Sequence, residues 1–402
     1  KKGEMLAGFN KDFIYEGRHH GDAVFEVYAA EDIYSPDYQK DADGNWIVVY
    51  AKDTLVTTIT TGEDGMAVAE NLPLGAYRVV EKTAPEGFVL NPEAAEVVFV
   101  YEGQDTPVVE QEVTVGDERQ KVAITVEKQD AENSAVVAGA VFGIYNKEDI
   151  TADGKVIVAA DTLLQEMTSD EKGQAGCTLD LPLGSYYVKE LKAPAGYVSS
   201  NEVLNFDAFY QGQDVETVVL KAVKKNQPTT VEITKSDITT GTELDGASLK
   251  VLDKDGNVVD EWTSVKEAPH VIKRLVVGET YTLREEFAPY GYLKATDITF
   301  TVEDNGDVQK VEMKDEVPTG LLIINKKGEF LDKVTLLDNA KGTVEHLFEY
   351  ITGSLTEVTF HVYAAEDIKA ADGVSEDYFK ADELVGTITT DANGIAQLGD
   401  LP

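Results

Sequence analysis

A five-residue motif of Tyr, three variable residues and Glu occurs three times, and each copy leads into a second motif, Ala-Pro-x-Gly-aromatic. The copies are 77–81, 186–190 and 281–285, followed by 84–88, 193–197 and 288–292. Side chains alternate between the two faces of a strand, so Tyr and Glu share a face with an apolar residue between them. The pattern therefore points a carboxylate into a core three times. A buried carboxylate without a partner is costly, so each strand must meet a complementary group.

Further landmarks repeat with these motifs and predict tandem domains. A Leu-Pro-Leu-Gly segment or its equivalent precedes each one, at 72–75, 181–184 and 275–278. An aromatic segment at 25–33 recurs at 142–150 and 360–368, and in shorter form at 249–256. The last residues, Asp400-Leu401-Pro402, repeat Asn71-Leu72-Pro73. We expect repeats at 1–119, 120–227, 228–317 and 318–402, with the fourth cut before its glutamate and the chain an excerpt of a longer protein.

Short alternating segments separated by Asp-Gly and Asn-Gly turns predict an all-β protein. Examples are 122–126, 231–233, 298–302 and 321–324. Many short strands at this spacing favour tandem immunoglobulin-like β-sandwiches in an elongated array. An insertion near 332–355 is ambiguous. Its apolar residues Val344, Leu347, Phe348 and Ile351 have helical spacing, but a hairpin fits equally well.

Composition excludes several classes of function. The formal net charge is −39, with 74 acidic and 35 basic residues. Nucleic acid binding needs a basic footprint, and anionic membranes attract basic segments, so neither partner is expected. The single cysteine, Cys177, precludes an intrachain disulfide, and the five histidines have no metal-binding spacing. We expect no metal, no cofactor and no enzyme that turns over a substrate, because no catalytic triad, carboxylate pair or phosphate loop stands out.

A lysine lies 14 residues before the landmark segment of each of the first three repeats, which begins at Phe25, Phe142 or Leu249, and closes an alternating apolar face. These lysines are Lys11, Lys128 and Lys235, and Lys326 holds the corresponding place in the fourth repeat before the insertion. In the first repeat the inward face is expected to be Met5, Ala7, Phe9 and Lys11. The last strands end similarly on Asp117 and Asp315, each 11 residues before the next lysine. The second repeat is less regular, with Asn226 as the acceptor and Lys224 on the same face.

Each complete repeat thus aims a lysine, a glutamate and an aspartate or asparagine inward. One interpretation is a buried ion-pair network, which adds little stability. The other is a covalent amide between the lysine and the aspartate or asparagine. Burial lowers the pKa of a lysine and exposes a neutral amine, raises the pKa of a glutamate, and fixes both groups close together. Spacing alone leaves both open.

These motifs resemble the Cna protein B-type domain, also described as the SpaA-like prealbumin fold, of Gram-positive surface adhesins and pilins. The glutamate box of that family is similar to 281–292 here, and 233–237 and 313–315 resemble its lysine and acceptor strands. The resemblance implies isopeptide bonds assisted by a glutamate. Carried over by position, they are Lys11–Asp117 with Glu81, Lys128–Asn226 with Glu190, and Lys235–Asp315 with Glu285. Lys326 would stay unpaired in this chain.

The resemblance implies a structural stalk of a cell-wall-anchored surface adhesin or pilin-like protein, extracellular on a Gram-positive bacterium. The only catalysis expected is self-modification that happens once. The alternative is a ligand-binding module that grips a host matrix protein or glycan through the long loops 34–49 and 369–380. The expected partners are therefore the cell wall and, through the full-length protein, a host matrix protein or glycan. The sequence leaves the ligand and any polymerisation into pili open.

Overall fold

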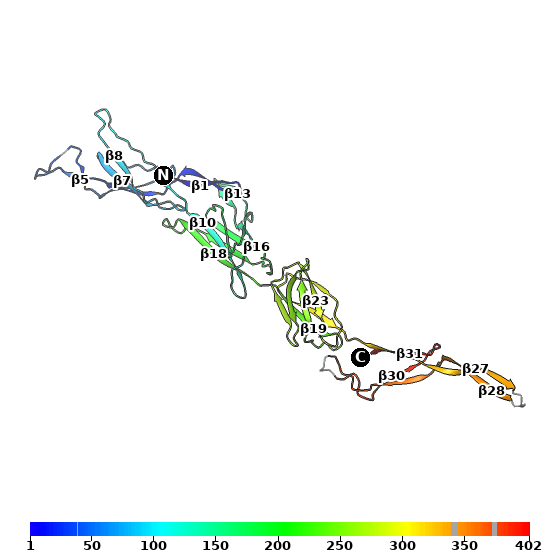
Figure 1. The fold of residues 1–402 in the computed structure, drawn as a ribbon. Coiled ribbons are helices and arrows are strands. Elements are labelled where there is room, and N and C mark those ends of the chain that lie inside the picture. The colour runs from blue at the N-terminus through cyan, green and yellow to red at the C-terminus, as the bar shows by residue number, and fades with distance from the viewer. Residues whose placement is uncertain (38, 339–343, 372–375) are drawn as a thin grey trace. The chain divides into compact units, whose positions relative to one another are not determined.

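The computed structural model describes residues 1–37, 39–338, 344–371 and 376–402, and Figure 1 shows the chain as a ribbon. Every regular element in these ranges is a β-strand, so the all-β prediction is confirmed. Among these residues no helix is present that could cross a membrane. The chain divides into two compact units, Lys1–Pro228 and Thr229–Pro402. Each unit is described by itself.

The first repeat contains β1 to β9 and forms two sheets. One sheet has the order β2-β1-β9 and the other β6-β3-β7-β8, with β4 and β5 paired separately in the loop 34–49. The strands are Lys2–Phe9, Phe13–His19, Val24–Ala29, Ile33–Tyr34, Val48–Tyr50, Leu55–Thr60, Gly75–Thr83, Ala95–Phe99 and Gly116–Asp117. Its core contains Val27, Ala29, Ile33 and Tyr77.

The second repeat contains β10 to β18 and is built in the same way. Its sheets have the orders β15-β10-β18 and β14-β11-β16-β17, and β12 and β13 form a separate pair. The strands are Lys121–Asp130, Val141–Asn146, Ile150–Ala152, Lys155–Val158, Leu163–Thr168, Gln174–Gly176, Gly184–Lys192, Val203–Ala208 and Thr217–Asn226. Its core cluster is the largest and includes Phe13 from the first repeat.

The third repeat contains β19 to β25, with sheet orders β22-β19-β25 and β21-β20-β23-β24. The strands are Thr230–Asp237, Ser248–Leu252, Val258–Thr263, His270–Lys273, Thr280–Phe287, Ile298–Thr301 and Val308–Asp315. In each of the three repeats the first strand lies parallel to the last strand and hydrogen-bonds to it. The chain therefore enters and leaves each sandwich on neighbouring strands.

The described residues after 317 form three two-stranded sheets, β26-β31, β27-β28 and β29-β30. The strands are Gly320–Asn325, Lys327–Asp338, Val344–Ser354, Thr359–Tyr363, Leu384–Thr389 and Ile395–Leu401. The ambiguous insertion is a hairpin: β27 pairs antiparallel with β28, from Lys327–Ser354 to Asp338–Val344. In Figure 1 this ribbon projects beyond β26 and β31. Both loops considered for ligand binding contain residues outside the described ranges: residue 38 in 34–49, and residues 372–375 in 369–380.

Candidate lysine–carboxylate sites

The glutamate of each repeated motif lies opposite the first residue of the landmark segment on the neighbouring strand. Glu81 pairs with Phe25, Glu190 with Phe142 and Glu285 with Leu249, and the register shifts by one residue next to each pair. Such a bulge re-aims a side chain, and it occurs here at the same place in all three repeats. The motif tyrosines Tyr77 and Tyr186 are buried, and each hydroxyl donates to the proline carbonyl of the preceding Leu-Pro-Leu-Gly segment.

The Ala-Pro-x-Gly segment that follows has the same structural role in each repeat. It turns the chain so that the backbone N–H ten residues beyond the glutamate donates to the carboxylate Oε2. The donors are Asn91 at 3.1 Å, Ser200 at 3.0 Å and Ala295 at 2.7 Å. One carboxylate oxygen is thus held by the turn, which leaves Oε1 available to a second group.

In the third repeat that second group is Lys235. Its Nζ lies 3.1 Å from Glu285 Oε1 and donates to Asp315 Oδ1. All three side chains are buried. Burial raises the pKa of Asp315 to about 6, against the lowering effect of the Lys235 contact. The structure therefore brings together the three residues that the sequence analysis selected in this repeat.

In the second repeat Lys128, Glu190 and Asn226 meet in a looser arrangement. Lys128 Nζ lies 3.5 Å from Glu190 Oε1, and Asn226 Nδ2 donates to Glu190 Oε2 at 2.7 Å. Burial lowers the pKa of Lys128 to about 8, although Glu190 acts in the opposite direction. Lys224, which lies on β18 with Asn226, binds the carboxylate of Glu202 instead at 2.8 Å. Lys128 and Asn226 thus meet at the carboxylate of Glu190, which both side chains contact.

In the first repeat the expected lysine, Lys11, is not at the site. Lys11 lies exposed in the turn between β1 and β2 with a φ of 65°, away from Asp117 and Glu81. Lys1 is the lysine at the site. Its Nζ lies 2.6 Å from Glu81 Oε1 and donates to Asp117 Oδ1, and all three side chains are fully buried. Burial raises the pKa of Asp117 to about 6, against the lowering effect of Lys1.

The count of 14 residues failed in the first repeat because a hairpin lies between the lysine and the landmark. β1 and β2 fill that interval, a bulge at Ala7 breaks the expected alternation, and Met5 is exposed. Two signals identify Lys1. The acceptor on the last strand pairs with the residue two positions after the lysine: Asp117 with Gly3, Asn226 with Asp130, and Asp315 with Asp237. In addition, the tetrapeptide Lys-Lys-Gly-Glu occurs at both 1–4 and 326–329.

Lys326 corresponds to Lys1 in its backbone contacts as well. The main-chain nitrogen of Lys326 donates to Gly394 O at 2.8 Å, as that of Lys1 does to Gly65 O at 2.6 Å and that of Lys128 to Gly173 O at 2.7 Å. The Lys326 residue itself is exposed.

A family match accounts for this architecture. The family described as the SpaA prealbumin-like fold domain matches residues 18–114, 122–223 and 229–317. The chain belongs to this family. The three matched ranges cover well over half of its residues, and the predicted prealbumin-like sandwiches are confirmed.

Solved structures of similar fold include proteins of Gram-positive bacteria. The Bacillus anthracis TIE protein is 26% identical over 78% of this chain, with a TM-score of 0.47, and this chain spans about half (51%) of its length. A streptococcal ancillary pilin is 20% identical over 73% of this chain and 92% of its own, with a TM-score of 0.25. BcpA, the major pilin subunit of Bacillus cereus, is 15% identical over 79% of this chain and 100% of its own, with a TM-score of 0.36. No curated protein matches the chain.

Proposed function

We propose that this chain is part of the stalk of a Gram-positive surface adhesin or pilin-like protein, and that three of its domains are locked by self-formed isopeptide bonds. The bonds are Lys1–Asp117, Lys128–Asn226 and Lys235–Asp315. The observation that carries the proposal is the repeated burial of one lysine, one glutamate and one acceptor on the first, central and last strands.

The electrostatics of these sites favour amide formation. A neutral amine is the nucleophile, and burial moves the pKa of Lys128 toward that form. A neutral carboxyl group is the better acceptor, and burial moves the pKa of Asp117 and Asp315 toward that form. In the third repeat Lys235 Nζ attacks Asp315 Cγ, a C–N bond forms, and a C–O bond breaks. Glu285 takes the proton from Nζ and returns it to the departing oxygen, which leaves as water.

In the second repeat the same step proceeds from an asparagine. Lys128 Nζ attacks Asn226 Cγ, and the amide nitrogen leaves as ammonia after receiving the proton through Glu190. The contacts of Glu190 support both transfers, since Oε1 faces Lys128 and Oε2 accepts from Asn226 Nδ2. The fixed arrangement supplies the high effective concentration that amide formation needs.

The position of each bond suits a domain that carries tension. In the third repeat the chain enters along β19, reaches Lys235 near the end of that strand, and leaves from Asp315 at the end of β25. The two strands are parallel neighbours. Force entering at one end of the domain would pass through the amide to the other end. The residues between Lys235 and Asp315 would then be bypassed and would not extend.

The amide also removes an energetic cost that an ionic site would keep. Two or three ionisable groups buried together incur desolvation penalties that their attraction does not fully offset. An amide carries no charge, so the desolvation penalty of the lysine, and of the aspartate where one is present, disappears when the bond forms. It provides the covalent constraint that disulfides give to other secreted proteins, in a chain with a single cysteine.

The test is the intact mass of the purified 402-residue chain under denaturing conditions. We expect a mass below that of the sequence by two waters, from the first and third repeats, and one ammonia, from the second. Peptide mapping should recover branched peptides that join Lys1 to Asp117, Lys128 to Asn226 and Lys235 to Asp315. A mass equal to that of the sequence would reduce the three sites to buried ion pairs and reject the proposal.

A further inference from the structure

The hairpin that follows Lys1 caps the neighbouring domain. Phe13, at the start of β2, is 6% exposed and belongs to the core cluster of the second repeat. Leu6, Phe9 and Tyr15 pack against the same cluster. The Tyr15 hydroxyl donates to Asp180 O at 2.8 Å, in the segment just before Leu181. The β1–β2 hairpin is therefore a docking element between two successive domains of the first unit.

Polar contacts fix the orientation of this docked hairpin. The guanidinium of Arg119, which lies between the two repeats, is 3.7 Å from the centroid of the Tyr15 ring and forms an ion pair with Asp180. The backbone N–H of Asp180 donates to Asp12 Oδ1 at 3.1 Å, and Arg18 forms an ion pair with Asp153. The contact thus joins an apolar face to a rim of hydrogen bonds and ion pairs.

The β27–β28 hairpin has the same place and the same local geometry. It follows Lys326 in the second Lys-Lys-Gly-Glu segment, as β1–β2 follows Lys1. Its first pair, Lys327 with Ser354, matches Lys2 with His19. The register then shifts between Leu331 and Lys333, and in the first repeat it shifts between Leu6 and Gly8. The single extra residue occurs at the same distance from the lysine in both hairpins.

This alignment matches the docking residues one by one. In the docked hairpin Leu6 pairs with Tyr15 and Phe9 with Phe13. In the other, Leu331 pairs with Tyr350 and Val334 with Phe348. Three of the four residue types are identical, and the fourth is also apolar.

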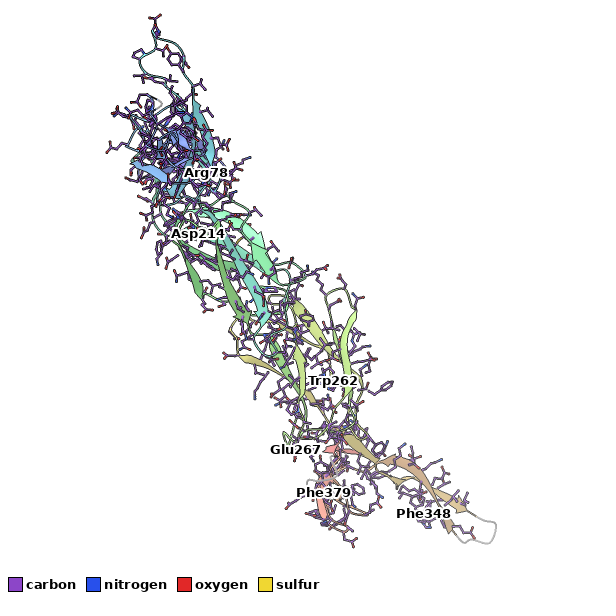
Figure 2. The ribbon with its side chains drawn as sticks, turned by 90° about the vertical axis from the view of Figure 1, so that its left-hand side faces the viewer. Arg78, Asp214, Trp262, Glu267, Phe348 and Phe379 are labelled. Carbon is purple, nitrogen blue, oxygen red and sulfur yellow. The ribbon has the colours of Figure 1, made fainter. Side chains whose placement is uncertain are left out.

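The burial of the two sets differs. Leu331, Val334, Phe348 and Tyr350 are 52%, 42%, 51% and 60% exposed. Figure 2 places Phe348 on the projecting ribbon. An exposed apolar face of this extent on a soluble protein marks an interaction site.

We propose that the β27–β28 hairpin is a docking element for a prealbumin-like domain that presents the same end as the second repeat does. The occupant is defined by the chemistry that β1–β2 meets: an apolar core edge beside a Leu-Pro-Leu-Gly segment, with a backbone carbonyl placed for a tyrosine hydroxyl. The other face of the hairpin is less suited to this contact, because it alternates apolar residues with charged ones such as Lys333 and Glu349.

A reciprocal exchange of the two hairpins tests the proposal. Residues 327–354 replace 2–19, and 2–19 replace 327–354, so that each hairpin sequence still occurs once. Hydrogen exchange followed by mass spectrometry reads the backbone protection of each hairpin. In the natural chain we expect protection of 2–19 and rapid exchange in 344–354. In the exchanged chain the moved 344–354 segment should exchange at least about tenfold more slowly, because it now faces the second repeat.

Two matched variants of the moved hairpin identify the face that docks. Tyr350→Glu should abolish the protection, whereas Ile351→Glu, on the other face, should retain it. Equal effects of the two variants would overturn the proposal. So would rapid exchange of the moved hairpin, or loss of protection in β10 and β18, because a hairpin that fits this kind of domain should not unfold it.

Two measurements on chains that keep both hairpins in their original positions complete the test. Phe9→Val makes the docking set of the first hairpin identical to Leu331, Val334, Phe348 and Tyr350, and it should keep 2–19 protected. Loss of that protection would overturn the proposal even if the exchanged chain did not fold. Concentration-dependent protection of 344–354 in the unmodified chain would identify a second copy as the occupant and would also overturn it. None of these readouts depends on amide formation.

Discussion

Replacing Glu285 of the third repeat should prevent the isopeptide bond between Lys235 and Asp315 from forming. In Glu285→Gln the carboxylate that faces Lys235 is replaced by an amide of nearly the same shape, which cannot accept the proton from Nζ. Lys235 and Asp315 are 80 residues apart in sequence. By loop-closure entropy, a cross-link over that separation stabilises the folded state by about 4.5 kcal/mol. For a domain of this size the loss lowers the melting temperature by roughly 20–35 °C.

Intact mass and hydrogen exchange measure this effect separately. The Glu285→Gln chain should retain the water that the wild-type third repeat loses. Protection of β19 and β25 should collapse at a lower temperature, while β10 and β18 of the second repeat should be unaffected. Under force, the variant should release about 270 Å of chain from this repeat, since an extended residue spans about 3.4 Å, and wild type should release none of it.

The neighbouring residue supplies the control. Glu286 lies on the opposite face and forms a partly exposed ion pair with Lys250. Glu286→Gln should therefore leave the mass deficit intact and change stability by less than about 1 kcal/mol. Equal mass deficits for the wild type and both variants, each measured against its own sequence, would refute the reasoning, because either the bond does not form or Glu285 is not needed for it.

Three further outcomes are expected. Lys1→Gln should retain one water in the first repeat, whereas Lys11→Gln should have the wild-type mass. Asn226→Ala leaves the buried Lys128 of the second repeat unlinked, with its pKa lowered to about 8 from an ordinary 10.5. Because the folded state disfavours the charged amine, the free energy of unfolding should fall by about 3 kcal/mol as the pH falls from 10.5 to 8, and stay level below that. Urea denaturation at a series of pH values measures this change. Phe13→Ala should destabilise by about 3–5 kcal/mol, and Phe348→Ala by no more than about 0.5 kcal/mol, as measured by the same denaturation.

Local patterns predicted the sandwiches because each strand shows its buried face as a period of two. The Tyr-x-x-x-Glu motif placed Glu190 and Glu285 correctly in the interior, because two residues four positions apart in a strand lie on the same face. The insertion near 332–355 was ambiguous for the opposite reason. Apolar residues cover much of both faces of the β27–β28 hairpin, so no period of two stands out. The antiparallel pairing of β27 with β28 decided between hairpin and helix.

The lysine of the first repeat shows where counting along the chain fails. The distance from lysine to landmark is constant only when nothing is inserted between them, and β1 and β2 occupy that interval. The pairing register is more reliable, because the acceptor always lies opposite the residue two after the lysine. Register is a property of two strands far apart in sequence, so it became visible only with the fold.

The sequence by itself determined the repeats, the strand faces and the glutamates, because these depend on residues a few positions apart. The tertiary structure decided that Lys1 rather than Lys11 meets Glu81 and Asp117, and that one of two matching hairpins is buried while the other is exposed. Both depend on contacts between segments separated by many residues. A strand pattern specifies which side chains must be covered, and only the packed neighbours specify what covers them.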